Sequence, residues 1–354
     1  MSKKTILYIC GSMNQTTMMH QISKHLSDYD SYFSPYYADG FLGKVAQTHL
    51  LDFSVLGGQF RERTTKYLKS HDLNIDFGGK LFDYDLVFTC SDLVVPKNIL
   101  NKKVILIQEG MTDPENFMYY LVKKLSLPRW LASTSTTGLS DCYDKFCVAS
   151  EGYKDLFIRK GVKPEKIVIT GIPNFDNSKQ YLTNNFHYKN YVFVATSDMR
   201  ETYKYENRKK FIKKALKIAN GRQLIFKLHP NELIERATQE INMYAPGALV
   251  FSKGKTEEMI ANCDVLITRY SSVVYVGLAL GKEVHSDFDI NELKRLLPVQ
   301  NDGTSSHNIA MVAEKLLETA KAKAFVTFHR KSAYGLGKLL RKIKQKRKWV
   351  NAKS

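Results

Sequence analysis

The sequence lacks the features that mark membrane, secreted and metal-binding proteins. No stretch of the 354 residues reaches the roughly 20 consecutive apolar residues that a transmembrane helix needs. The first residues run directly into a strand pattern, without the apolar segment of a signal peptide. Only five cysteines occur, and their spacing matches no common zinc or redox motif: Cys10, Cys90, Cys142, Cys147 and Cys263. We therefore expect a soluble, cytoplasmic protein with buried free thiols and neither a disulfide nor a metal.

Acidic residues are also in short supply, since 35 Asp and Glu oppose 53 Lys and Arg and leave a net charge of +18. Part of the excess lies in residues 338–348, where Leu339, Leu340 and Ile343 recur at helical spacing and Trp349 follows. This basic amphipathic tail, residues 326–354, fits two interpretations: contact with an anionic membrane, or a solvated helix packed on the protein body. Nucleic-acid binding is not expected, because no RNA-binding or helix-turn-helix pattern accompanies the charge.

Apolar runs alternate with helical stretches along the chain, which predicts an α/β fold with parallel sheets and crossover helices. The first series has predicted strands at 5–9, 85–89, 104–107, 146–149 and 167–170, with helices at 16–26 and 152–160. The second has strands at 191–195, 223–227, 248–251, 264–268 and 283–286, with helices at 207–219, 232–244, 272–280 and 306–319. Turn-forming residues 171–178 separate the two series. We predict two Rossmann-like domains, residues 1–175 and 176–325, facing a central cleft.

Polar residues follow the predicted strands of the second series, where parallel sheets bind ligands. Lys227 ends a strand, and His229, Pro230 and Asn231 follow it. His229 could donate to a phosphate oxygen of a donor and assist departure of the nucleotide, although an isolated histidine is often structural. Arg200, in the first loop of this domain, could neutralise the same phosphate or form an ion pair with Asp198.

Two adjacent hydroxyls end another strand of this domain. Ser271 and Ser272 stand at the predicted start of a helix, where free backbone N–H groups favour an anion, with Tyr270 beside them. Ordinary helix capping by serine is the alternative. Together with His229, these residues predict a site for a phosphate-bearing leaving group.

A carboxylate follows a strand of the first domain. Glu109 lies between Gln108 and Gly110 at the end of an apolar strand. It could be the general base for an acceptor hydroxyl, with Asp113 as the rival carboxylate and a surface turn as the alternative. The acceptor side of the cleft would also include residues of the first strand-to-helix loop: Gly11, Ser12 and Asn14.

These elements resemble three short motifs of bacterial GT-B sialyltransferases, polysialyltransferases and Kdo transferases: acidic-acidic-Gly, His-Pro and Ser-Ser/Thr. The corresponding segments here are Gln108-Glu109-Gly110, Lys227-Leu-His-Pro230 and Tyr270-Ser-Ser272. The stretch from Asp264 to Ser272 also resembles CDP-glycerol glycerophosphotransferases, and residues 170–176 are similar to the domain link of UDP-N-acetylglucosamine 2-epimerases. The resemblance implies an inverting transfer without metal or other cofactor, with Glu109 as base and His229, Ser271 and Ser272 on the phosphate.

This chain departs from both patterns. Gln108 replaces the first acidic residue, and Arg269 stands where the CDP-glycerol enzymes carry Asp. Asp83-Tyr84-Asp85 superficially resembles the metal-binding Asp-x-Asp element of other glycosyltransferases, but it precedes a strand rather than ending one. The CDP-glycerol enzymes also use a His-Gly element in the first domain, where this chain has Glu109-Gly110. This difference and Arg269 favour a CMP-sugar donor over a CDP-polyol donor.

The sequence thus predicts a glycosyltransferase that moves a sugar from CMP-Kdo or a CMP-sialic-type acid to a glycan or glycolipid acceptor of lipopolysaccharide or capsule. It would work in the cytoplasm, with the tail giving peripheral contact to the inner face of the cytoplasmic membrane. Three alternatives stay open: a CDP-glycerol-type glycerophosphotransferase, a hydrolysing UDP-N-acetylglucosamine 2-epimerase, and a non-enzymatic basic scaffold that binds anionic membrane or nucleic acid.

Overall fold

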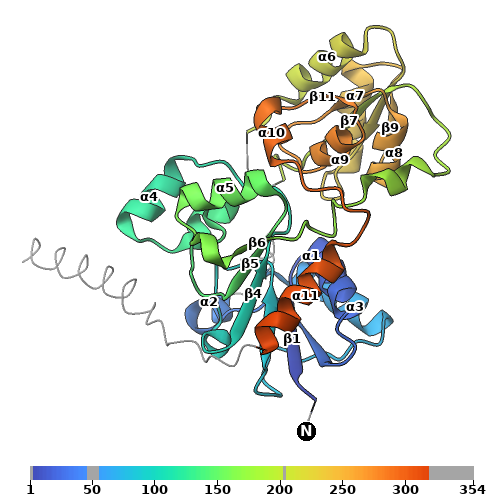
Figure 1. Ribbon diagram of the computed structural model, residues 1–354. Helices are drawn as coiled ribbons and strands as arrows, with labels where there is room; N and C mark the ends of the chain where they lie inside the picture. The colour runs from blue at the N-terminus through green and yellow to red at the C-terminus, as the bar shows by residue number, and fades with distance from the viewer. Residues whose placement is uncertain (1–2, 46–55, 202–204, 319–354) are drawn as a thin grey trace, which may run out of the picture. The chain divides into compact units, whose positions relative to one another are not determined.

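A computed structural model describes residues 3–45, 56–201 and 205–318, so the predicted basic tail lies outside the described residues. The chain forms two compact units, coloured along the sequence in Figure 1. The first takes the chain up to Cys147, Phe157–Val168 and the chain from Ile309; the second takes Val148–Leu156 and Ile169–Asn308. The predicted division at residues 175 and 176 stays a prediction.

The first unit is built on a six-stranded sheet in the order β2-β1-β3-β4-β5-β6. Its strands are β1 (Thr5–Cys10), β2 (Asp30–Pro35), β3 (Leu86–Thr89), β4 (Lys103–Ile107), β5 (Lys145–Val148) and β6 (Ile167–Ile169). The pairs from β2 to β5 are parallel. Tyr8 on the central strand β1 stacks on Phe33 and Phe88, with ring centroids 4.9 and 5.1 Å away. Apolar contacts thus run across three neighbouring strands.

Strand β2 was missed by the sequence analysis. Its sequence, Asp30-Ser-Tyr-Phe-Ser-Pro35, contains no apolar run beyond two aromatic residues, and its first three residues are only partly buried. An edge strand tolerates proline and needs apolar residues only where it covers the core. The apolar-run criterion therefore finds the buried strands and passes over this one.

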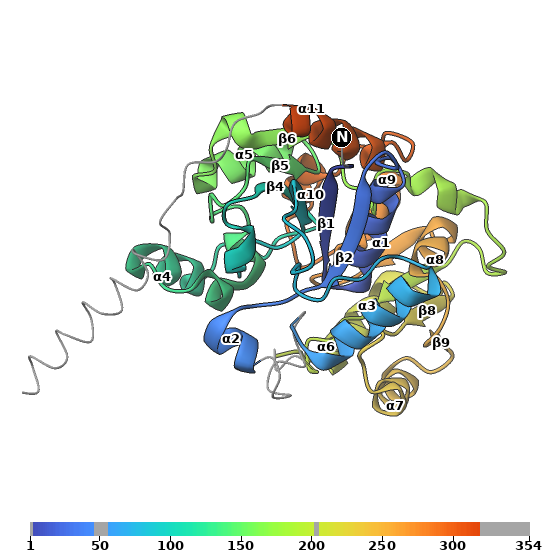
Figure 2. The ribbon, with the colours of Figure 1, turned by 90° about the horizontal axis from the view of Figure 1, so that it is seen from below.

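The helices of the first unit are α1 (Met13–Ser23), α2 (Gly40–Val45), α3 (Gly58–Ser70), α4 (Phe117–Leu125) and most of α11 (Ser305–Glu318), with short 3-10 turns η1 (Lys97–Ile99), η2 (Arg129–Thr136) and η3 (Pro164–Lys166). Helix α5 (Glu151–Lys160) is divided between the units, since residues up to Leu156 belong to the second and residues from Phe157 to the first. Figure 2 shows α1 and α3 beside β1 and β2. The prediction that α1 starts at residue 16 was wrong: the helix starts at Met13, because the Ser12 side chain caps it by accepting from the Gln15 backbone N–H.

Helix α11 joins the first unit although it follows the second unit in sequence. Ile309, Ala310, Ala313 and Leu317 pack into the same apolar cluster as β1, β3 and β4. The Lys4 ammonium donates to the Leu317 carbonyl at 3.0 Å. The last described helix therefore closes the core of the first unit rather than the second.

The second unit has a five-stranded parallel sheet in the order β11-β10-β7-β8-β9. Its strands are β7 (Val192–Ala195), β8 (Leu224–Lys227), β9 (Leu249–Phe251), β10 (Val265–Ile267) and β11 (Glu283–His285). All five predicted strands are confirmed with ends shifted by a residue or so. The order reverses between β7 and β10, and such a switch point is where open parallel sheets bind ligands at the carboxyl ends of their strands.

Alternate residues of β7 face opposite sides of this sheet. Val192 and Val194 pack with α6 (Arg208–Ala219) and α7 (Ile234–Tyr244). Phe193 and Ala195 pack in a second cluster with α8 (Thr256–Asn262) and α9 (Val274–Ala279). The remaining elements of the unit are η4 (Ser178–Leu182) and α10 (Ile290–Leu296). Two apolar layers on one sheet make this unit doubly wound, as predicted.

All five cysteines are buried free thiols. Burial raises the pKa of Cys263 to about 12 and also raises the pKa of Cys10 and Cys90, so these thiols stay protonated and unreactive. The prediction of structural thiols is confirmed. Within the described ranges, no helix combines the length and apolar character needed to span a bilayer.

Candidate functional site

In the first unit, Glu109 lies just beyond β4, and helix α1 holds its carboxylate. The Ser12 hydroxyl donates to Glu109 Oε1 at 2.6 Å, and the Gln15 side-chain amide donates to Oε2. Gln15 is only 4% exposed, so its amide has a fixed position. Two donors, one on each oxygen, set the orientation of the carboxylate.

Gly11 makes this arrangement possible. A Cβ atom at this position would lie 2.0 Å from Gln15 Oε1. Any side chain here would displace Gln15 and with it one of the two donors to Glu109. The structure thus brings together Gly11, Ser12 and Glu109 from the predicted set, and adds Gln15. The spacing Ser-x-x-Gln is a capping-box signal that could have revealed both the helix start and Gln15.

The other predicted residues of this unit have less accessible or less direct positions. Gln108 is buried, and its amide donates to the Gly110 carbonyl at 2.7 Å, which shapes the turn after β4. Asn14 is exposed in the first turn of α1. Asp113 accepts from the Thr134 hydroxyl at 2.7 Å, and its backbone N–H donates back to that hydroxyl at 2.8 Å. Asp113 therefore closes a local loop contact, whereas Glu109 is held by the helix next to it.

In the second unit, His229 follows β8 with its backbone fixed and its ring partly exposed. The His229 backbone N–H lies 3.0 Å from Thr196 Oγ1 and 2.9 Å from Glu232 Oε2. The ring nitrogen Nδ1 accepts from the Asn231 backbone N–H at 3.3 Å and lies 3.6 Å from Asp198 Oδ2. Since Nδ1 accepts a hydrogen bond, the neutral ring carries its proton on Nε2. Among the described residues, Nε2 has no partner, so it is a donor directed away from the sheet.

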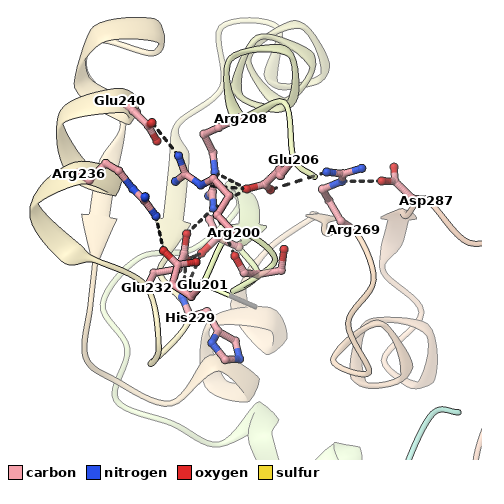
Figure 3. A network of polar contacts seen from close by, with 12 residues as sticks. Arg200, Glu201, Glu206, Arg208, His229, Glu232, Arg236, Glu240, Arg269 and Asp287 are labelled. Carbon is pink, nitrogen blue, oxygen red and sulfur yellow. Dashed lines mark hydrogen bonds and ion pairs between the residues drawn. The ribbon is translucent and has the colours of Figure 1, made fainter. Parts of the chain in front are cut away.

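A buried ion network stands behind His229, and Figure 3 shows the imidazole pointing away from it. Arg208 pairs with Glu232 and, at 2.9 Å, with Glu206; the three side chains are at most 3% exposed. Glu232 also accepts from the Thr196 hydroxyl. The same carboxylate thus bonds to Arg208, to Thr196 and to the His229 backbone, so the network sets the position of the histidine.

Arg200 belongs to this network. It lies 2.8 Å from Glu240 and 3.5 Å from Glu206, and its side chain is 17% exposed. The alternative prediction for Arg200 was a structural ion pair with Asp198. Arg200 does form ion pairs, but with Glu240 and Glu206. Asp198 instead accepts from the Asn231 amide at 2.9 Å. Contact of Arg200 with a phosphate stays a prediction.

The network extends to Arg269 at the end of β10. Arg269 lies 2.6 Å from Asp287 and 3.9 Å from Glu206 Oε1. Burial raises the pKa of Glu206, while Arg208, Arg200 and Arg269 oppose that rise. The charge of the Glu206 carboxylate therefore depends on the three arginines around it.

Sequence reasoning missed Glu206, Arg208 and Glu232. Arg208 and Glu232 pair across 24 residues of sequence, and no local pattern signals the burial of Arg208 and Glu206, which are only two residues apart. Charged side chains are usually solvated, and only the fold shows that these are buried and paired. Lys227 is a similar case: its ammonium is buried and donates to the Leu228 and Ser252 carbonyls at 3.0 and 3.1 Å. These contacts tie the ends of β8 and β9 together.

The hydroxyls after β10 do not form the predicted helix cap. Helix α9 starts at Val274 and not at Ser272, and it has only six residues. Its first turn is closed by the backbone, with Val274 and Tyr275 N–H groups donating to the Ser271 and Ser272 carbonyls. The Ser271 hydroxyl only approaches the Val273 N–H at 3.5 Å. Both serines are partly exposed, so their hydroxyls are left to other partners.

A buried pair of tyrosine hydroxyls holds helix α9 in place. The Tyr275 hydroxyl lies 2.7 Å from that of Tyr153, and both rings are buried. Tyr270 is half exposed, packs edge-on against Phe288 and lies beneath the Arg269 guanidinium. Pro230 is exposed in the turn after His229. The segment from Tyr270 to Ser272 thus presents an aromatic ring and two hydroxyls beside the switch point.

In the described part of the chain, no group of three His, Cys, Asp or Glu side chains is arranged to hold a metal ion. Asp83 pairs with Lys102, and Asp85 accepts from the Thr5 N–H at 2.9 Å. Thr5 is the first residue of β1, so these two aspartates lie at the amino ends of the strands, at the edge opposite to Glu109.

No family model matches the chain, and no curated protein matches it in sequence. Its fold does match solved structures. A UDP-N-acetylglucosamine 2-epimerase aligns with a TM-score of 0.52 at 13% identity, covering 92% of this chain and 100% of that one. The fold is GT-B. The Neisseria meningitidis UDP-GlcNAc 2-epimerase bound to UDP-GlcNAc aligns at 0.50 with 14% identity, covering 95% and 100%.

The wall teichoic acid polymerase TagF aligns less well, with a TM-score of 0.48 at 13% identity, covering 89% of this chain and 88% of that one. At such identities the likeness is one of fold. The predicted GT-B architecture of two Rossmann-like domains is confirmed, whereas the resemblance to sialyl and Kdo transferases stays a prediction.

Proposed function

We propose that the protein is a glycosyltransferase that moves a sugar from a cytidine-activated donor, CMP-Kdo or a CMP-sialic-type acid, to a glycan acceptor of a bacterial surface polysaccharide. The transfer would invert the anomeric centre and need no metal. On this proposal the second unit binds the nucleotide and the first unit binds the acceptor.

One observation carries the donor side: His229 holds its Nδ1 toward Asn231 and leaves Nε2–H without a partner among the described residues. A neutral imidazole in this tautomer donates a hydrogen bond to a phosphate oxygen and so stabilises the negative charge that develops on the departing nucleotide. Ser271 and Ser272 lie at the end of β10, beside the switch point, and supply further donors. A nucleotide-activated donor also agrees with the UDP-GlcNAc bound by the Neisseria enzyme of the same fold.

On the acceptor side, Glu109 is the base. Its orientation by Ser12 and Gln15 suits a carboxylate that takes a proton from a hydroxyl, because each oxygen keeps a lone pair for that proton. The stronger fixation of Glu109 favours it over Asp113.

Nucleotide binding gives the first test. A thermal-shift panel of CMP, CDP, UMP, UDP and GDP should show the largest stabilisation with CMP, about 2.7 kcal/mol at a hundredfold excess over the dissociation constant. A larger shift with UDP would redirect the proposal to the 2-epimerase activity, which is checked by incubating UDP-N-acetylglucosamine and looking for N-acetylmannosamine. A larger shift with CDP would favour glycerophosphate transfer. No shift with any nucleotide would refute a nucleotide-dependent enzyme.

Replacing the base gives the second test. Glu109→Gln should lower kcat by roughly 10²- to 10⁴-fold, the usual contribution of a general base, and should leave the nucleotide thermal shift intact. Asp113→Asn is the matched control and should keep most of the activity. The assay is run with and without EDTA, which should not change the rate. The reverse ranking of the two variants would make Asp113 the base.

A further inference from the structure

Helix α4 of the first unit is apolar on two opposite faces. Tyr119 and Val122 are buried in a cluster with Ala132 of η2. Phe117, Tyr120 and Leu125 are 77%, 58% and 56% exposed. Tyr120 lies three positions and Leu125 eight positions after Phe117, spacings that recur on one broad face of a helix, so these side chains are exposed on the same side of α4.

The neighbouring turn η2 adds to this surface. It packs against α4 and exposes Trp130 at 44% and Leu131 at 38%. We call these five residues, Phe117, Tyr120, Leu125, Trp130 and Leu131, the α4 face. In both views α4 lies at the periphery of the first unit, beyond the strands of its sheet (Figure 1 and Figure 2). The unit thus leaves large apolar side chains in solvent on an outer element.

The charges around the α4 face are basic. Residues 117–131 contain Lys123, Lys124 and Arg129 and no acidic residue. Lys123 and Lys124 are exposed in the last turn of α4, next to Leu125. The Lys123 ammonium donates to the Lys160 carbonyl at 3.1 Å and the Arg129 guanidinium donates to the Asp92 carbonyl, so Lys124 is the cation closest in position to the exposed side chains. The acid just before the helix, Glu115, lies 3.6 Å from Arg159 and accepts from the Tyr120 hydroxyl at 3.4 Å.

Exposed aromatic and leucine side chains beside lysines are the composition of helices that lie in the interface of a bilayer. The apolar side chains enter the headgroup region, and the ammonium groups attract anionic lipid. We propose that the α4 face docks the protein on the surface of an anionic lipid bilayer. This inference is independent of the proposed enzymatic function, since it uses no residue of the candidate site.

Sedimentation with vesicles tests the proposal on the full-length chain. Phe117→Ser/Leu125→Ser should lower binding to phosphatidylglycerol–phosphatidylcholine vesicles by about tenfold or more, because two exposed apolar anchors are removed. The matched control, Leu182→Ser/Met243→Ser, removes two exposed apolar side chains of the second unit, 54% and 69% exposed, and should bind like the unmodified protein. Vesicles of pure phosphatidylcholine should bind more weakly. Equal binding of both variants would overturn the proposal.

Tryptophan fluorescence gives a readout that needs no disruptive substitution. The chain has two tryptophans, Trp130 on the α4 face and Trp349 in the basic tail. In Trp349→Phe, the remaining Trp130 should shift its emission to shorter wavelength when anionic vesicles are added. In Trp130→Phe, a shift of Trp349 with no shift of Trp130 in the companion variant would assign docking to the tail and refute the α4 face.

The alternative to membrane docking is that the α4 face binds a second copy of this chain. Light scattering of the unmodified protein without lipid should show the same mass as Phe117→Ser/Leu125→Ser. A dimer that this double variant dissociates would mean that the α4 face joins two copies, and the membrane proposal would fail.

Discussion

Arg208→Met should destabilise the second unit by about 3–5 kcal/mol, the usual cost of removing one partner from a buried ion pair. The substitution leaves Glu206 and Glu232 buried without their closest cation, and both carboxylates are shielded from water. Urea denaturation followed by circular dichroism measures the loss. Lys163→Met is the control: Lys163 pairs with Asp141 at 2.7 Å, but its side chain is 55% exposed, and ion pairs in contact with solvent contribute little to stability.

The same variant should show a distinctive pH dependence. Burial already raises the pKa of Glu206 above its ordinary 4.5, and Arg208 is the first of the arginines that oppose the rise. Without Arg208 the folded state favours protonated Glu206 more strongly. Stability gained by binding this proton is present at low pH and is lost as pH rises through the folded pKa, so the deficit relative to the unmodified protein should be smaller near about pH 5 than near about pH 8.

A compensating substitution separates charge burial from lost packing. Adding Glu206→Gln to Arg208→Met removes one uncompensated charge and should recover part of the lost stability. If the double variant is as unstable as the sum of the two single variants, the loss comes from packing of the arginine stem, and the electrostatic explanation is wrong.

The fold was largely predictable because buried parallel strands leave a simple sequence signal. Strands β7, β8, β9 and β10 of the second sheet are short runs of mainly apolar residues bounded by turn formers or charges, and the periodicity of the helices between them is visible in the sequence. Edge strand β2 gave no such signal, since it buries only one end. Helix α11 was found as a helix, but nothing local shows that Ile309 and Ala313 pack on β1 and its neighbours.

The candidate site was predictable where it depends on position along a strand. Glu109 follows β4 and His229 follows β8, so both lie at the carboxyl edge of their sheets, the edge at which parallel sheets in general bind ligands. The contacts that orient them were not predictable, because Ser12 and Gln15 meet Glu109 across 97 and 94 residues of sequence. The predicted helix start at Ser272 was wrong for a local reason. Backbone hydrogen bonds close the first turn of α9, so the helix begins at Val274, after both serines.

His229→Ala should reduce kcat by roughly 10²- to 10⁴-fold if Nε2–H protonates or stabilises the departing nucleotide. It should also weaken the thermal shift with CMP, because the same N–H binds the phosphate in the ground state. His229→Asn offers a side-chain amide without a titratable proton, so it should recover part of the binding but little of the turnover. Equal activity of all three proteins would exclude His229 from the chemistry.

The partnership of His229 with the serine hydroxyls is tested by combining substitutions. Ser272→Ala should by itself lower both turnover and nucleotide affinity, since Ser272 is left with an uncommitted hydroxyl at the end of β10. If both residues hold one phosphate, His229→Ala/Ser272→Ala should lose much less than the sum of the two single effects, because either substitution already breaks the shared interaction. Full additivity would place the two side chains on different parts of the ligand. The comparison is interpretable because the Glu232–Arg208 network fixes the His229 backbone in every variant, so a lost effect cannot be attributed to movement of the loop.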